Sequence, residues 1–286
     1  MNNARRTIAS PVRLQGTGLF TGDPSAIEIR PTDGQPGIFF LADNGLIPAH
    51  ISALSGRPVH PAFEHMPPRC TSIADEHTNI ATVEHLLSAL AGLGITDAFL
   101  QLTGPEVPIL DGSARPFVDA ILDAGTLDLP QPLQPITVTR AVRVEDANAS
   151  ITVEPAAAAS YHYTLDYGDN SPIKPGTASW SGAPETYIKQ VAPARTFCLD
   201  TEASAMHNAG LFTHLSTRDM LVVGEDGPIE NRYRFENECA GHKLLDLIGD
   251  LSLVGAPLCA RVTAERSGHA LAHRAARAVI DQIAAQ

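Results

Sequence analysis

The chain has 286 residues, of which 44% are hydrophobic and 18% are charged, a composition typical of a folded globular protein rather than a disordered or fibrous one. Its 20 Lys and Arg residues against 32 Asp and Glu residues give a net charge of -12. This charge argues against a nucleic-acid-binding protein, which needs a basic face to displace counterions, but it allows a local basic pocket for a small phosphorylated molecule.

The first part of the chain predicts short strands and two helices. Residues 26–30 alternate apolar and polar side chains, and residues 37–41 and 98–102 are apolar runs next to glycine and proline, patterns that predict strands. Leucines at helical spacing predict a helix over 81–93, which two glycines end. A second helix is predicted over residues 114–124.

A proline-rich stretch follows these elements. Residues 128–135 contain three prolines, which favour an extended linker because proline and the residue before it both avoid helical backbone angles. We therefore expect an N-terminal domain over residues 1–128, a linker over 129–135 and a C-terminal domain over 136–286.

The C-terminal half also mixes strands and helices. Strands are predicted over 136–139, 149–153, 161–167 and 259–264, and helices over 203–208, 237–254 and 271–284. The leucine rhythm after His85 is repeated after His242, which allows a duplicated α+β unit with one key histidine in each copy.

We expect no transmembrane helix and no disulfide framework. The sequence has no signal peptide and no run of about 18 apolar residues. The four cysteines are scattered without C-x-x-C spacing, a pattern typical of reduced thiols in a cytoplasmic protein. They are Cys70, Cys198, Cys239 and Cys259. Any metal ion would then be held by histidine and carboxylate side chains.

Three polar residues lie one helical turn apart in the predicted helix over 237–254. His242, Asp246 and Asp250 share one stripe of this helix. An imidazole and a carboxylate one turn apart can bind one metal ion, although the same stripe is also typical of a solvated polar face. Gly249, inside the helix, suggests close packing against another element because glycine costs about 1 kcal/mol there relative to alanine.

Two further segments carry candidate catalytic residues. Thr82 is a plausible helix N-cap, so Glu84 would lie in the first turn. Adjacent residues on a helix point about 100° apart, so His85 is the candidate ligand and Glu84 the candidate base. His269 follows Ser-Gly on a predicted tight turn. An unperturbed histidine titrates near neutral pH, which suits a general acid. An ordinary capped helix and a surface loop histidine are the alternatives.

Taken together, these residues indicate one kind of chemistry. Two histidines and one aspartate leave the fourth position of a zinc ion open, which is the pattern of catalytic rather than structural zinc sites. A carboxylate base and a protonated histidine beside such an ion would support metal-assisted amide hydrolysis.

Several ordered motifs give the sequence a resemblance to a known family. These motifs are Gly16-x-Gly18-Leu19, Thr82-Val83-Glu84-His85-Leu86, residues 89–95, residues 108–114, Ala194-Arg195-Thr196-Phe197, His242-Lys243-x-x-Asp246-x-x-Gly249-Asp250 and Ser267-Gly268-His269. This set resembles the UDP-3-O-acyl-N-acetylglucosamine deacetylase family, the zinc amidases of lipid A biosynthesis. The resemblance implies an α+β fold of two domains with similar duplicated topology, each a β-sheet packed on helices, with the active site between them.

The resemblance also implies the chemical role of each residue at the reaction centre. His85, His242 and Asp246 would bind zinc. Glu84 would be the general base and His269 the general acid.

Other residues would support catalysis or bind the UDP-linked acylated amino sugar. Asp250 would orient the general acid, and Thr196 would assist the oxyanion. The implied substrate-binding residues are Leu19, Phe197, Lys243 and Arg266. Contact with a membrane surface would be transient, through the acyl chain of the substrate.

The sequence departs from the family pattern at three places. Phe20 stands where members usually have a histidine, Gly241 stands where they usually have an arginine, and residues 211–220 differ from the stretch that helps to form the acyl passage. The length of the acyl chain, and the need for one, are therefore left open. The alternatives are a related deacetylase of another nucleotide sugar and a non-catalytic nucleotide-sugar-binding relative.

Overall fold

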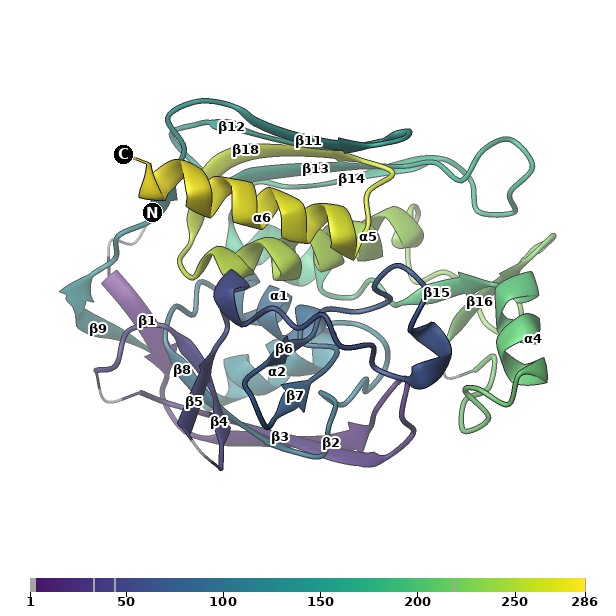
Figure 1. Cartoon of the computed structure of the whole chain (residues 1–286), viewed down its shortest axis with the longest axis horizontal. Helices are drawn as coiled ribbons and strands as arrows, with labels where there is room; N and C mark the ends of the chain where they lie inside the picture. The colour runs from purple at the N-terminus through teal and green to yellow at the C-terminus, as the bar shows by residue number, and fades with distance from the viewer. Residues whose placement is uncertain (1–3, 33, 44, 219, 286) are drawn as a thin grey trace.

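Two β-sheets form the outer layers of the molecule, and helices fill the space between them (Figure 1). The computed structural model describes residues 4–285 except positions 33, 44 and 219. Both termini lie at the same end of the molecule in Figure 1.

The first sheet comes from the N-terminal half of the chain. Its strand order is β2-β3-β8-β4-β5; β4 and β8 are parallel, and the other neighbours are antiparallel. The strands are β2 (Val12–Thr17), β3 (Pro24–Arg30), β4 (Ile38–Ala42), β5 (Gly45–Pro48) and β8 (Ala98–Thr103). The helices on its inner side are α1 (Glu84–Gly92) and α2 (Arg115–Ala124).

The second sheet has the same sequence of pairings. Its order is β11-β12-β18-β13-β14, with β13 and β18 parallel, the other neighbours in this path antiparallel, and β10 added beside β18. The strands are β10 (Ile136–Thr137), β11 (Val142–Asp146), β12 (Ala149–Pro155), β13 (Ser160–Leu165), β14 (Gly176–Trp180) and β18 (Leu258–Glu265). The helices are α5 (Glu238–Leu251) and α6 (His269–Ala284).

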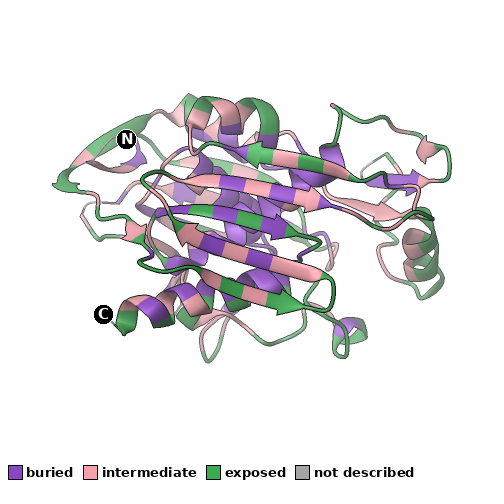
Figure 2. Cartoon of the chain, turned by 90° about the horizontal axis from the view of Figure 1, so that it is seen from above, coloured by how far each residue is buried: buried purple, intermediate pink, exposed green. Residues whose placement is uncertain are grey.

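The packing of the helices follows from the side-chain pattern. Strands of the second sheet alternate between buried and exposed residues (Figure 2), so one face contacts the helices. Helices α1 and α5 pack against each other between the sheets, and almost every residue of both is buried. Polar side chains on these two helices therefore need partners within the protein, because burying an unpaired polar group is costly.

The predicted elements of the two sheets agree closely with the structure. The strands expected over 26–30, 37–41 and 98–102 are β3, β4 and β8, and the helix expected over 114–124 is α2. In the C-terminal half, the expected strands coincide with β10, β12, β13 and β18, and the expected helices with α4, α5 and α6, within a few residues at their ends. The mixed α+β class is confirmed.

Two local expectations are wrong. Helix α1 begins at Glu84 rather than near position 81, because Thr82 adopts a positive φ of 58° and its hydroxyl donates to Glu106 Oε1 at 2.7 Å instead of capping the helix. His269 does not lie on a turn: it is the first residue of α6, and Gly268 is the N-cap.

The proline-rich stretch is extended, as predicted, but it is also paired. Strand β9 (Thr126–Pro132) forms an antiparallel pair with β1 (Ala4–Ile8). Prolines are tolerated here because β9 pairs on one side only in this two-stranded sheet. The proposed domain boundaries stay a prediction.

A smaller unit projects from the side of the two layers. It consists of β15 (Phe197–Leu199), α4 (Asp200–Asn208), β16 (Leu221–Gly224) and β17 (Gly227–Pro228), with the three strands in one sheet. The remaining elements are β6 (Ile73–Ala74), β7 (Asn79–Ile80), α3 (Pro184–Thr186), η1 (Ile51–Ala53), η2 (Pro61–Phe63), η3 (Tyr187–Val191) and η4 (Ser252–Val254).

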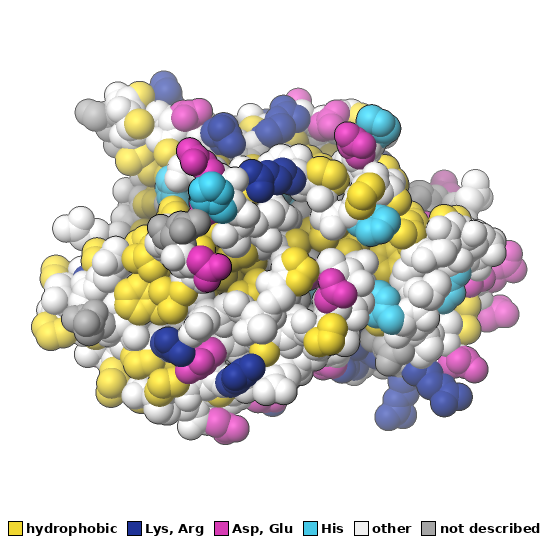
Figure 3. Space-filling view, turned by 60° about the horizontal axis from the view of Figure 1, so that its bottom comes forward, with side chains coloured by type: hydrophobic (Ala, Val, Ile, Leu, Met, Phe, Trp, Pro, Cys, Tyr) yellow, Lys and Arg dark blue, Asp and Glu magenta, His cyan; other side chains and the backbone are white. Residues whose placement is uncertain are grey.

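The surface fits the charge balance of the sequence. On the face drawn in Figure 3, basic and acidic side chains are interspersed among apolar and neutral ones. Among the described residues, no helix is both long and apolar enough to cross a membrane. The four cysteines are free thiols, and three of them are buried.

Candidate metal centre and active site

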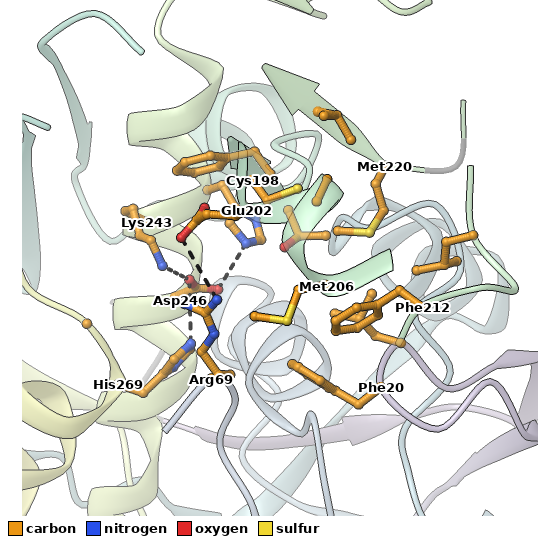
Figure 4. Close-up of a pocket in the computed structure, with 18 of the residues that line it drawn as sticks. Phe20, Arg69, Cys198, Glu202, Met206, Phe212, Met220, Lys243, Asp246 and His269 are labelled. Atoms are coloured by element: carbon orange, nitrogen blue, oxygen red, sulfur yellow. Dashed lines mark hydrogen bonds and ion pairs between the residues drawn. The ribbon is translucent and has the colours of Figure 1, made fainter. Parts of the chain in front are cut away.

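A cavity of about 700 Å³ opens where α1, α5 and α6 meet the projecting unit. Figure 4 shows polar groups such as Lys243, Asp246 and His269 on one side of it, and Met206 and Phe212 on the other. The cavity therefore combines a polar end with an apolar arm.

The polar end exists because α1 and α5 approach each other very closely. A Cβ atom at Gly249 would lie only 2.1 Å from the backbone oxygen of Glu84. Any residue other than glycine at this position would therefore push the two helices apart. The close packing predicted at this glycine is confirmed. As a result, the rings of His85 and His242 lie with their centroids 5.0 Å apart.

The described part of the chain contains one group of side chains that could bind a metal ion together. It consists of His85, His242 and Asp246 and is called the metal group below. One ligand atom from each residue lies within 4.8 Å of the others. Asp246 Oδ1 is 3.5 Å from Nε2 of His85 and 3.3 Å from Nε2 of His242. This carboxylate oxygen is buried and has no hydrogen-bond partner, so a cation between the three side chains would satisfy it.

The protonation of this group also suits a metal ion. Burial lowers the pKa of His242 to about 3, so its imidazole is neutral. Its Nδ1–H donates a hydrogen bond of 3.2 Å to the Ala194 backbone oxygen, which leaves Nε2 free to bind a metal ion. Burial acts to raise the pKa of Asp246, but His242 and Lys243 hold it well below its usual value. Two imidazoles and one carboxylate are a donor set that zinc accepts.

An acid–base pair lies beside the metal group. Burial raises the pKa of Glu84 to about 7, and its Oε2 accepts a hydrogen bond of 3.0 Å from the Thr71 backbone N–H. His269 Nε2 lies 4.0 Å from Glu84 Oε1, and its Nδ1 lies 2.9 Å from Asp250 Oδ2. Burial acts to lower the pKa of His269, but Asp250 raises it to about 9. At neutral pH the histidine is thus a cation.

The other predicted site residues fall into two groups. Those that line the cavity together with the metal group are Leu19, Thr196, Phe197, Lys243 and Arg266. Asp250 is not among the residues that line the cavity, but its Oδ2 contacts Nδ1 of His269, which does line it.

The cavity-lining residues are themselves held in place. The Thr196 backbone N–H donates to the Gly112 oxygen at 2.7 Å, and the Phe197 ring stands edge-on to His242, with centroids 6.0 Å apart. Lys243 Nζ is 2.8 Å from Asp246 Oδ2. Arg266 forms an ion pair with Asp166, so its guanidinium is engaged before any ligand arrives.

Sequence reasoning missed several residues that hold the site. Glu106 is fully buried and accepts hydrogen bonds from the backbone of Leu19, Phe20 and Thr21 and from the Thr82 hydroxyl. It thereby fixes the loop that carries Leu19. No periodicity or spacing marks a single glutamate in a loop, so only the tertiary contacts reveal it.

The apolar arm ends on an aromatic cluster. Phe20, Phe63 and Phe212 come from three separate segments, and their ring centroids lie 5.5–6.2 Å apart. Phe212, Leu215 and Met220 all line the cavity, so the stretch over 211–220 forms part of its wall. Position 219 lies outside the described residues.

The geometry defines a class of protein: a buried His-His-Asp group that could hold one metal ion, with a buried carboxyl group and a buried histidine beside it, is the arrangement of metal-dependent hydrolases. Comparisons with known proteins identify the family. A family model described as LpxC, UDP-3-O-acyl N-acetylglycosamine deacetylase, matches residues 5–281. The chain belongs to this family.

Curated relatives cover nearly the whole chain. The UDP-3-O-acyl-N-acetylglucosamine deacetylase of Leptospira biflexa is 31% identical over 281 residues, covering 98% of this chain and 90% of the relative. The deacetylase of the same name from Acidithiobacillus ferrooxidans is 36% identical over 279 residues, covering 96% of this chain and 90% of the relative. That of Myxococcus xanthus is 32% identical over 277 residues, covering 96% and 86%.

Proposed function

We propose that this chain hydrolyses the N-acetyl amide of a UDP-3-O-acyl-N-acetylglucosamine, a reaction of lipid A biosynthesis, in the cytoplasm. The observation that carries the proposal is the juxtaposition of the buried His85, His242 and Asp246 group with Glu84 and His269 in one cavity. Full-length relatives with this activity in their names support it.

The metal group supplies the electrophilic part of the reaction. His85, His242 and Asp246 would hold zinc, as is general in this family. When bound, zinc acts as a Lewis acid that polarises the amide carbonyl and lowers the pKa of a water molecule. Thr196, which lines the same cavity, would donate a hydrogen bond to the oxyanion that develops on the carbonyl oxygen.

Glu84 and His269 each carry out one proton transfer. Glu84 takes a proton from the attacking water as the new C–O bond forms. His269, protonated at neutral pH, gives the proton on Nε2 to the amide nitrogen as the C–N bond breaks. The products are acetate and the free amine of the sugar. Asp250 accepts a hydrogen bond from the Nδ1–H of His269 and so keeps Nε2 directed at the leaving nitrogen.

The remaining residues bind the substrate. Lys243 and Arg266 place positive charge near the sugar and diphosphate, Phe197 packs on the sugar ring, and Leu19 lines the cavity. The apolar arm, which ends on the phenylalanine cluster, accepts the acyl chain.

The candidate site lies between the two halves of the chain, since α1 supplies Glu84 and His85, α5 supplies His242 and Asp246, and α6 supplies His269. The identical order of pairings in the two sheets supports a duplicated α+β unit in two domains with a boundary near residues 129–135.

The direct test compares acylated and non-acylated UDP-N-acetylglucosamine as substrates, with and without a chelator, alongside metal analysis of the purified protein. We expect stoichiometric zinc and release of acetate from the acylated substrate only. Faster turnover of the non-acylated substrate would instead indicate a deacetylase of another nucleotide sugar. Absence of zinc and of amide hydrolysis after zinc is added would refute the proposal.

A further inference from the structure

Thr71 occupies an unusual position behind the candidate active site. It is fully buried in the segment before β6, and its backbone oxygen accepts the Val83 N–H at the start of α1. Its backbone N–H donates to Glu84 Oε2 at 3.0 Å, while its hydroxyl lies 2.5 Å from Asp250 Oδ1. One residue thus contacts both the candidate base and the partner of the candidate acid.

His273 completes this arrangement. It lies one turn after His269 on α6 and is 8% exposed. Its Nε2 is 2.8 Å from the Thr71 hydroxyl oxygen and 3.9 Å from Asp250 Oδ1. The proposed chemistry gives His273 no part, although it is buried next to the acid–base pair.

The protons in this cluster can be assigned by counting donors. A threonine hydroxyl has one proton, and the Asp250 carboxylate can only accept, so Thr71 donates to Asp250. The Thr71 oxygen must therefore accept from His273, which fixes the proton of His273 on Nε2. His269 donates from Nδ1 to the other oxygen of Asp250, a closer partner than the Thr71 hydroxyl at 3.5 Å.

We propose that Thr71 and His273 are positioning residues for the reaction, acting through a directed chain of hydrogen bonds from His273 to Thr71 to Asp250, which in turn holds His269. With one oxygen of Asp250 occupied by Thr71, the other is fixed toward His269 Nδ1, so the Nε2–H of His269 is aimed into the cavity. The backbone N–H of Thr71 fixes Glu84 in the same way. This proposal rests on the proposed function for its kinetic consequence, but its hydrogen-bond pattern is observable without activity.

The kinetic experiment uses a pair of substitutions at each position. Thr71→Val removes the hydroxyl but keeps the shape and the backbone N–H, and Thr71→Ser restores a hydroxyl. His273→Leu removes the donor, and His273→Gln restores an N–H at the same reach. We expect Thr71→Val and His273→Leu to lower kcat by roughly 10- to 100-fold, with KM and zinc content within twofold of wild type. The Ser and Gln variants should recover most of that loss.

A matched control and a double-mutant cycle separate positioning from general destabilisation. Thr32 is also buried, and its hydroxyl donates to the Gln35 oxygen far from the cavity, so Thr32→Val should leave kcat unchanged. In a His269→Ala background, Thr71→Val should change the residual rate by less than twofold, because it acts through the missing residue. A full additional loss in that background, or wild-type kcat in Thr71→Val, would overturn the proposal.

A spectroscopic readout makes the test independent of turnover. In ¹⁵N-labelled wild-type protein loaded with zinc, we expect NMR to show His273 protonated on Nε2 and His269 protonated on Nδ1. An unprotonated Nε2 on His273 would refute the hydrogen-bond chain even if the enzyme is active. A wild-type protein with this pattern but no hydrolysis would refute only the proposed function. If Thr71→Val shows no cooperative thermal transition, the protein is not folded and its rate is not used. The proposal is then judged on His273→Leu and His273→Gln, with the same expected changes in kcat.

Discussion

At the residue scale, the site raises the pKa values of two ionisable groups through different causes. Glu84 and His269 are both buried, but burial raises the pKa of the carboxyl to about 7, whereas Asp250 outweighs the effect of burial on the imidazole and raises its pKa to about 9. Both pKa values are thus raised above their ordinary values, and neighbouring groups with perturbed pKa values in one cavity are typical of functional sites.

A pH dependence follows from these two values. Because Glu84 must be ionised to accept a proton, kcat/KM should rise as the pH increases through about 7. Because His269 must be protonated to donate a proton, kcat/KM should fall as the pH increases past about 9. Steady-state rates between pH 5 and pH 10 on about half-unit steps measure both limbs. His269→Gln should abolish the basic limb and Glu84→Gln the acidic one, each with a large drop in rate. A basic limb that persists in His269→Gln would contradict the assignment.

At the element scale, the approach of α1 to α5 determines whether the site exists. The spacing of His242 and Asp246 belongs to one helix, but His85 reaches them only because Gly249 lets the backbone of Glu84 approach. A similar approach occurs at Gly92, where a Cβ atom would lie 2.3 Å from the Tyr187 ring.

Substitution of Gly249 by alanine tests this contact. Alanine would favour the helix by about 1 kcal/mol, but its Cβ would meet a backbone oxygen that cannot move without separating the helices. We expect a net destabilisation of about 3 kcal/mol and weaker zinc binding, measured by urea unfolding and metal titration. Gly56, around which nothing lies within 4 Å of a Cβ position, is the control. Equal stabilities of the Gly249→Ala and Gly56→Ala proteins would contradict the argument.

The projecting unit and its neighbouring loops determine the length of the apolar arm. Phe212 closes the arm together with Phe20 and Phe63. Phe212→Ala should open it and raise kcat/KM for longer acyl chains relative to shorter ones by roughly fourfold per added methylene that becomes buried. Competition between substrates of defined chain length measures the ratio. The control is Phe39→Ala, on the first sheet and outside the cavity, which should leave this ratio unchanged. A ratio in Phe212→Ala equal to that of the wild-type protein would show that Phe212 does not limit the length of the acyl chain.

At the scale of the whole molecule, the metal group joins parts of the chain from both sheets. His85 comes with α1, and His242 and Asp246 come with α5. An ion held by all three would therefore stabilise the packing of one layer of helices against the other, in addition to its chemical role.

Metal removal measures this linkage. With free zinc at about a thousand times its Kd, binding stabilises the folded state by about 4 kcal/mol, so a chelator should lower Tm and added zinc should restore it. Differential scanning calorimetry on wild-type protein gives the shift, and the Asp246→Asn variant, which weakens the donor set, should show a smaller one. An unchanged Tm on chelation would show that the ion does not link the two halves.

The sequence by itself predicted the strands β3, β4, β8, β10, β12, β13 and β18 and the helices α1, α2, α4, α5 and α6, but not β2, β5, β11 or β14. The predicted elements and the stripe of His242 and Asp246 depend on the pattern of side chains within one segment, which is local. The ordered motifs also pointed to Glu84, His85 and His269, although the start of α1 and the placement of His269 required correction, since Thr82 bonds to Glu106 rather than capping the helix.

Only the tertiary structure decided which of these residues meet and what supports them. Thr71 and Asp250 are 179 positions apart, and Glu106 reaches a loop 87 positions away; neither contact leaves a periodic trace in the sequence. The pKa values of Glu84 and His269 likewise depend on burial between two sheets and on a neighbour from another helix. Spacing along a helix fixes contacts within it, whereas contacts between elements depend on how their faces pack.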